Sequence, residues 1–317
     1  PVAGVAVTFA VTSGGGTVSP TTPVLTDDSG IAALTFWVGG TSPGANSLTA
    51  TVDGLAGSPV TFTATVTTDG PSQIALQAGD GQTATVGTAV ATPPSVLVRD
   101  VFNNPIAGVP VTFAVTAGGG TVSPATPVLT DANGIAVTAW TLGNAAGSNS
   151  LTATADTLTG SPVSFSATGI AGNASSIALE AGDGQIATVG TAVAIAPVVI
   201  VRDQFNNPVA GVAVTFTVAT GAGTVDPATP VLTDASGIAA ATSWTLGNTA
   251  GVNSLTASAD GLAGSPVSFN ATGTAAAATQ VALEVGDGQS ATVATAVAIA
   301  PAVIVRDQFN NPVAGVE

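Results

Sequence analysis

The chain has 317 residues, of which 18 are Asp or Glu and three are Lys or Arg, giving a formal net charge of −15. A chain this acidic repels phosphate backbones and anionic lipid headgroups, so nucleic acid and membrane surfaces are poor partners. Without His, Cys or Lys, the usual general bases and activated nucleophiles are missing, and we expect no enzyme. The longest apolar stretches, such as residues 192–201, are half the length that spans a bilayer, which predicts no membrane insertion in this segment.

Residues 71–173 predict a series of short strands. Val, Ile and Thr dominate, and the apolar residues Val111, Phe113 and Val115 alternate with small or polar ones, a pattern of period two. Clusters of Gly, Asn, Asp and Pro interrupt the pattern. The predicted strands span residues 73–77, 95–99, 109–115, 128–130, 135–142, 150–155 and 162–168. Seven strands at this spacing favour an immunoglobulin-like β-sandwich.

The same pattern recurs along the chain. The turn that ends in Pro105 returns at Pro208 and Pro312, so the period is 103 and then 104 residues, about one sandwich domain. We therefore predict an all-β protein of tandem immunoglobulin-like β-sandwiches in an elongated rod with short joints. The predicted division is 1–70, a domain lacking its opening strands; 71–173 and 174–277, complete domains; and 278–317, the opening strands of a further domain.

The repeated turn and strand motifs resemble a known family. Residues 206–216 read Asn-Asn-Pro-Val-Ala-Gly-Val-Ala-Val-Thr-Phe, and residues 233–239 and 253–257 complete the motif. This is similar to the bacterial Ig-like group 1 domain of the invasin and intimin type of surface protein. The resemblance implies an extracellular location on the cell surface and a structural stalk or filament segment that spaces or connects cells. The alternative that it implies is an adhesin module that itself binds cell-surface ligands of host or neighbouring cells.

Carboxylates are the only acid–base groups available, and most lie at turns, where Asp normally accepts hydrogen bonds from its own backbone. We predict no catalytic, cofactor-binding or metal site. The single alternative is calcium at the domain joints, with Asp80, Asp183 and Asp287 as candidate ligands in their Gly-Asp-Gly loops. One carboxylate per loop favours a tight hairpin turn instead.

Two further residue types occur once per repeat. Trp37, Trp140 and Trp244 predict buried core residues, with ligand stacking as the alternative. Arg99, Arg202 and Arg306 each precede an Asp, which predicts a local ion pair.

An Ile precedes the Trp in each repeat, but the number of residues between them differs. Ile135 and Trp140 are five residues apart, whereas Ile238 and Trp244 are six apart. Because an odd separation reverses the face of a strand, either the middle repeat turns Ile135 away or adjusts through a bulge, or the other repeats carry a bulge.

The two ends of the repeat pattern complement each other. Residues 278–317 repeat the opening strands that residues 1–70 lack, and Pro312–Val316 repeats Pro1–Val5. Two arrangements fit: a window of a longer covalent array, whose partners are neighbouring repeats, or identical chains that polymerise head to tail by strand donation.

Overall fold

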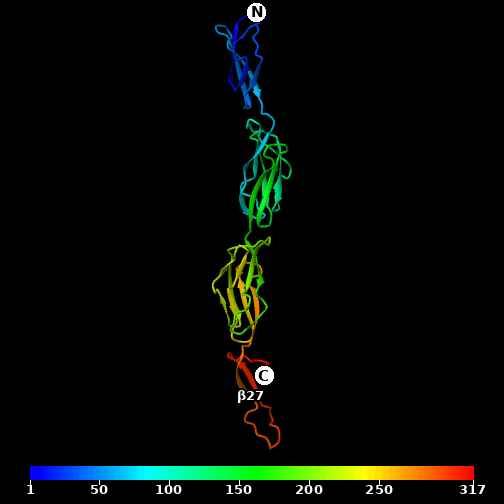
Figure 1. Ribbon diagram of the computed structural model, residues 1–317, viewed down its shortest axis with the longest axis vertical. Helices are drawn as coiled ribbons and strands as arrows, with labels where there is room; N and C mark the ends of the chain where they lie inside the picture. Colours follow the sequence, from blue (N-terminus) through cyan, green and yellow to red (C-terminus); the bar gives the residue numbers. More distant parts are fainter. The chain divides into compact units, whose positions relative to one another are not determined.

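The computed structural model describes all 317 residues and divides them into two compact units, residues 1–170 and residues 171–317. Every regular element is a β-strand (Figure 1), which confirms the predicted all-β class of tandem immunoglobulin-like sandwiches. The chain contains no helical segment that could cross a bilayer.

Within the first unit, two sheets form a sandwich from residues 73–170. The larger sheet has the strand order β12-β10-β15-β16-β8, and the smaller has the order β13-β9-β7. A separate two-stranded ribbon, β11-β14, completes the sandwich. The strands are β7 (Gln73–Ala78), β8 (Gln82–Thr85), β9 (Ser95–Arg99), β10 (Pro110–Ala117), β11 (Gly120–Ser123), β12 (Val128–Leu129), β13 (Ile135–Val137), β14 (Ala139–Leu142), β15 (Gly147–Thr154) and β16 (Val163–Ile170).

The core lies between these sheets. Alternate residues of β10, β15 and β16 point inward, and Val96 and Val98 of β9 meet them from the opposite sheet. Trp140, Leu151 and Phe165 are almost completely buried there. The period-two pattern of the sequence therefore marks the faces that pack together.

The second unit repeats this sandwich over residues 174–274. Its sheets have the orders β18-β26-β25-β20-β22 and β17-β19-β23, with the ribbon β21-β24. The strands are β17 (Ala174–Ala181), β18 (Gln185–Thr188), β19 (Val198–Asp203), β20 (Ala213–Thr220), β21 (Thr224–Asp226), β22 (Val231–Leu232), β23 (Ile238–Ala240), β24 (Ser243–Thr245), β25 (Gly251–Ser258) and β26 (Val267–Thr274).

Residues 1–66 form one sheet and a ribbon. The sheet order is β3-β1-β5-β6, and the ribbon is β2-β4. The strands are β1 (Ala6–Ser13), β2 (Gly16–Ser19), β3 (Val24–Leu25), β4 (Phe36–Gly39), β5 (Gly44–Thr51) and β6 (Val60–Val66). Residues 278–307 form only an antiparallel pair, β27 (Ala278–Val285) and β28 (Ala302–Asp307), with β27 labelled in Figure 1.

The Gly79-Asp80-Gly81 turn corrects one prediction. It is not a hairpin, because β7 belongs to the smaller sheet while β8 pairs in parallel with β16 in the larger one. The turn instead carries the chain from one sheet to the other. A four-residue strand with alternating Thr and Ala gives little apolar signal, which is why β8 escaped prediction.

The irregular spacing between Ile and Trp has a local cause. Ile135 and Ile238 are equally half-buried, so neither repeat reverses the strand. The second unit places its extra residue between β23 and β24, where the Thr242 N–H donates to the Asp226 carbonyl oxygen at 2.6 Å. This is the second of the two predicted arrangements, with the irregularity in the longer repeat.

Core packing in the first unit predicts unequal effects of two matched substitutions. Leu151→Ala should lower the free energy of unfolding of the 73–170 sandwich by about 2–5 kcal/mol, because it leaves a cavity against Phe165. Leu129→Ala, at an exposed position, should change it by less than about 0.5 kcal/mol. Urea unfolding followed by Trp140 fluorescence, with Trp37 and Trp244 replaced by Phe, measures both. Equal effects would contradict this core.

Candidate functional site

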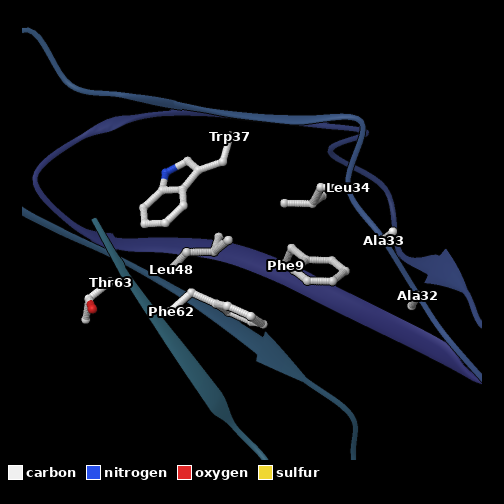
Figure 2. Close-up of a pocket in the computed structure, with 8 residues that line it drawn as sticks. All are labelled: Phe9, Ala32, Ala33, Leu34, Trp37, Leu48, Phe62 and Thr63. Atoms are coloured by element: carbon white, nitrogen blue, oxygen red, sulfur yellow. The ribbon is translucent and has the colours of Figure 1, made fainter. Parts of the chain in front are cut away.

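The first candidate site is an apolar groove on residues 1–66, defined here by Phe9, Leu34, Trp37, Leu48 and Phe62 (Figure 2). Ala32, Ala33 and Thr63 complete its lining around a cavity of about 350 Å³. Figure 2 shows Trp37 and Leu34 on one side and the side chains of Leu48, Phe62 and Phe9 on the other. None of the residues that line the groove is charged.

The equivalent surface of the next repeat is covered. Leu151 and Phe165 pair across β15 and β16 in the same register in which Leu48 and Phe62 pair across β5 and β6. Phe165 is 1% exposed, whereas Phe62 is 46% exposed. The difference arises because β7 and β9 lie over Phe165, and residues 1–66 contain no such layer.

The second candidate site is a buried carboxylate at the end of β9. Asp100 Oδ1 accepts hydrogen bonds from the N–H groups of Phe102 and Asn104 at 2.9 and 2.8 Å. Its Oδ2 accepts from the Asn104 side chain at 2.8 Å and from the Asp69 N–H at 3.2 Å. One carboxylate therefore fixes both the turn after β9 and the segment that enters β7.

The arrangement recurs at both equivalent positions. Asp203 Oδ2 accepts from the Gly172 N–H at 2.8 Å, and Asp307 Oδ2 accepts from the Ala276 N–H at 2.9 Å. All three carboxylates are buried. We call each of these, with its Asn partner, an Asp–Asn clasp: Asp100 with Asn104, Asp203 with Asn207, and Asp307 with Asn311.

Two of the clasps reach the preceding repeat within the same compact unit. The Asn104 side-chain amide donates to the Thr41 carbonyl oxygen at 2.7 Å. Asn311 donates to the Asn248 carbonyl oxygen at 2.8 Å and accepts from the Ala250 N–H at 2.8 Å. The amide of the clasp thus satisfies backbone groups in a neighbouring repeat as well as its own Asp.

The clasps depress the pKa of their carboxyl groups. Burial acts to raise the pKa of Asp100, but hydrogen bonds from Asn104 and from the backbone N–H groups of Asn104, Asp69 and Phe102 outweigh it. The pKa of Asp203 and of Asp307 lies below its usual value for the same reasons. All three clasps therefore stay ionised at neutral pH.

The three calcium candidates lie apart from any acidic cluster, and no group of three or more acidic residues in the chain could hold a metal ion. Asp80 Oδ1 accepts from the N–H and hydroxyl of Ser166 at 2.7 and 2.9 Å, which lowers the pKa of Asp80. Asp183 accepts from the Asn270 N–H at 2.7 Å. These two carboxylates tie the link between the sheets to β16 and β26.

The predicted Arg–Asp ion pairs are wrong. Consecutive residues of a strand point to opposite faces, so Arg99 faces outward while Asp100 faces the clasp. Arg202 and Arg306 instead donate to the carbonyl oxygens of Asn206 and Asn310, each at 2.9 Å.

The predicted core role of the Trp residues holds for two of the three. Trp140 and Trp244 are completely buried, whereas Trp37 is half-buried and lines the groove.

The sequence predicted the Asn-Asn-Pro turn correctly, but the clasp itself was not predicted. The signal was present, because Asp and Asn four residues apart recur in all three turns.

Comparison with known proteins agrees with this description. The family model described as "Bacterial Ig-like domain (group 1)" matches residues 73–168. Those residues are a bacterial Ig-like domain of group 1. The match confirms the resemblance drawn from the sequence, and the 174–274 sandwich repeats the group 1 domain in strand order and register.

Several solved structures are similar. The Escherichia coli adhesin FdeC is 22% identical, with a TM-score of 0.50, over 86% of this chain and 88% of that one. Invasin, described as a bacterial integrin-binding protein, is 21% identical over 77% and 48%, with a TM-score of 0.36. InvD of Yersinia pseudotuberculosis is 16% identical over 73% and 69%, with a TM-score of 0.44. At these identities the likeness concerns the fold alone. No curated protein sequence matched the chain.

The clasp predicts a pH-dependent effect of Asp100→Asn. A depressed pKa contributes stability that is present above the usual Asp value of about 3.9 and is lost as the pH falls through the folded-state pKa. The variant should therefore lower the urea midpoint of the 1–170 unit at pH 7, and the difference should shrink below about pH 4. Asp156→Asn, at an exposed carboxylate, is the control. A deficit that stays constant down to pH 2 would contradict the clasp.

The loop carboxylates predict that calcium removal has no effect. Because hydrogen bonds from β16 and β26 already hold Asp80 and Asp183, a chelator should leave the melting temperature unchanged. Differential scanning calorimetry with and without added Ca²⁺ measures this. A shift of several degrees on adding Ca²⁺ would show binding to the native state and restore the calcium alternative.

Proposed function

We propose that this chain is a structural stalk or filament segment of an extracellular bacterial surface fibre, which spaces or connects cells. Its partners are then neighbouring repeats of the same kind, and it carries no enzyme activity, cofactor or metal. The domain division proposed is 1–70, 71–173, 174–277 and 278–317.

The observation that supports this proposal most is the Asp–Asn clasp. The side-chain amides of Asn104 and Asn311 donate hydrogen bonds to backbone carbonyl oxygens of the preceding repeat. The carboxylates of Asp100 and Asp307, which accept hydrogen bonds from these amides, are buried. The joint between residues 1–66 and 73–170 and the joint between residues 174–274 and 278–317 therefore contain directional hydrogen bonds. The two Asn side chains that make them also donate to a charged acceptor in their own repeat, and such bonds are stronger than neutral ones. Hydrogen bonds that connect consecutive repeats support a spacer role, because they fix one repeat to the next and contribute no surface for a ligand.

The surface chemistry supports the same role. An excess of 15 negative charges keeps long exposed segments soluble and discourages random association. Aromatic residues, which dominate the energetics of binding surfaces, form 4% of the chain, and the two complete sandwiches bury their Trp residues.

The repeat period supplies a direct test of the spacer role. The chain is placed between a surface anchor and a tip module of known ligand, and residues 105–207 are deleted, so that Asn104 is followed by Pro208 and the turn is recreated. Tip binding should persist with the tip closer to the surface, as measured by super-resolution imaging. A control deletion of residues 105–180, which breaks the register, should abolish display.

The adhesin alternative makes the opposite prediction. Beads coated with the 317-residue chain alone should not adhere to host or bacterial cells if it is a spacer. Saturable adhesion that soluble chain competes away would contradict the spacer role and establish the adhesin.

A further inference from the structure

We propose that the peptide bond between Asp226 and Pro227 is a self-cleavage site, at which the Asp226 carboxylate breaks the chain in mild acid with water as the only co-substrate. Asp226 is the last residue of β21 and lies within the 174–274 sandwich. A chain that never cleaves itself would leave the spacer role intact, because one break in its own backbone is not turnover of a substrate. The site therefore goes beyond the proposed function.

Asp226 and Pro227 form the one Asp–Pro pair in the sequence. The other two repeats have a Ser before the corresponding proline, at Ser19 and Ser123. A carboxylate oxygen that attacks the carbonyl carbon of its own residue closes a five-membered ring, whereas a Ser hydroxyl would have to close a strained four-membered ring. The 174–274 repeat is therefore the one whose side chain has the length that this attack needs.

The proline directs the chemistry toward a break in the chain. Where Asp precedes another residue type, as in Asp80–Gly81, the next backbone nitrogen can attack the Asp side chain and form a succinimide, which leaves the chain intact. Proline has no backbone N–H, so this competing reaction is closed at Pro227. Its nitrogen belongs to a tertiary amide, which takes up a proton more readily than a secondary amide and then departs as an amine.

The Asp226 side chain is free to act as the nucleophile. It is exposed, and no group of the protein donates a hydrogen bond to it. By contrast, Asp234 Oδ1 accepts from the N–H groups of Ser236 and Ile238, which hold that carboxylate within its turn. The Asp226 carboxylate can therefore rotate toward its own carbonyl carbon, and solvent reaches the site.

The carbonyl group under attack is already polarised. Its oxygen accepts a hydrogen bond from the Thr242 N–H at 2.6 Å, which is shorter than the usual range of about 2.7–3.2 Å. A donor aimed at this oxygen draws electron density from the carbonyl carbon and stabilises the negative charge that develops on the oxygen during attack. Thr242 thus supplies the group that an oxyanion hole supplies in acyl transfer.

This donor depends on the extra residue of the longer repeat. Thr242 is the residue directly before β24. In the shorter 73–170 repeat the residue directly before β14 is Thr138, and its N–H donates to the Pro94 carbonyl oxygen instead. The 174–274 sandwich therefore combines the carboxylate, the proline and the backbone donor at one peptide bond.

The reaction balances with water alone. A carboxylate oxygen of Asp226 bonds to the carbonyl carbon of the same residue, and the carbonyl electron pair moves onto the oxygen that faces the Thr242 N–H. When the C=O bond re-forms, the C–N bond breaks, and its electron pair stays on the Pro227 nitrogen, which takes a proton from solvent. Water then opens the cyclic anhydride and leaves two carboxyl groups on Asp226. The sum is hydrolysis of one peptide bond, without any oxidant or reductant.

The response to pH arises at this site, because no other ionisable side chain lies on the strands around it. β21 packs against β20 and β24, and neither contains a charged residue, nor does the segment 227–232. Asp234 is the next acidic residue along the chain and is held in its own turn. The departing nitrogen needs a proton, so the rate of cleavage should rise as the pH falls from 7 to about 4.

The two products would stay assembled. Residues before the break supply β17 to β21, and residues after it supply β22 to β26. The two sets interleave, because β19 pairs with β23, β20 pairs with β22 and β25, and β18 pairs with β26. Cleavage thus removes covalent continuity but keeps the sandwich, and a pulling force along the chain is then carried by hydrogen bonds and core contacts alone.

Incubation of the 317-residue chain with protease inhibitors at pH 4 and at pH 7 tests the proposal. At pH 4, mass spectrometry and denaturing electrophoresis should show two fragments, residues 1–226 and residues 227–317, the second beginning Pro-Ala-Thr-Pro. Gel filtration of the same sample should show one species of unchanged size. The rate at pH 7 should be lower by about tenfold or more.

Three variants separate the contributions. Asp226→Ser, which recreates the residue found at Ser19 and Ser123, should abolish cleavage. Asp226→Glu keeps the charge but requires a larger ring, and it should slow cleavage strongly. Deletion of Thr242 recreates the spacing of the 73–170 repeat and should slow cleavage about tenfold, less than the loss of one donor costs in an enclosed enzyme site. Fluorescence of the buried Trp244 checks that each variant is folded.

The same incubation in urea separates the effect of the fold from the chemistry of any Asp–Pro bond. The unfolded chain lacks the hydrogen bond from Thr242 and should cleave about tenfold more slowly than the folded chain. A folded chain that stays intact at pH 4 would overturn the proposal, as would a break at the same place in Asp226→Ser. Equal rates in the folded chain, in urea and after deletion of Thr242 would overturn the role assigned to the fold.

Discussion

The contact between the opening strand pair and the aromatic face of the larger sheet is the constraint on which the rest of the structure depends. A single sheet cannot bury its apolar face alone, and stable domains therefore pair layers. Here Val96 and Val98 supply the second layer over Leu151 and Phe165, and no disulfide assists them. Where that layer is missing, over Phe62, the same face is open.

The strand that closes the 73–170 sandwich also leads into the group that joins it to residues 1–66. β9 supplies Val96 and Val98 to the core and then runs directly into Asp100, the centre of the clasp. The clasp holds the entry to β7 through Asp69 and meets the preceding repeat through Asn104. Core closure and connection to the preceding repeat are therefore coupled in one short segment of residues 96–104.

Much of the fold could be predicted from the sequence because local rules agree with the tertiary structure. Alternation at Val111, Phe113 and Val115 marks an inward face, and Asp131 accepts from the N–H groups of its own turn as expected. One strand that escaped prediction, β8, is held by a partner distant in sequence. β8 exists because β16 offers it an edge about 85 residues away, and no local pattern reports that pairing.

The candidate sites were less predictable for the same reason. The motif placed Asp100 at a turn, but its burial and its bond to Asp69 depend on how the chain folds back. Arg99 beside Asp100 suggested an ion pair because the two are adjacent, yet strand geometry separates adjacent side chains. Trp37 belongs to the same sequence position as Trp140 and differs only because nothing covers its sheet.

Hydrogen exchange of individual strands tests this dependence on the covering layer most directly. In dilute 317-residue chain, amides of β10 and β15 should exchange only through unfolding of the whole sandwich, whereas amides of β1 and β5 should exchange far faster. Equal protection of both sets of strands would contradict the account.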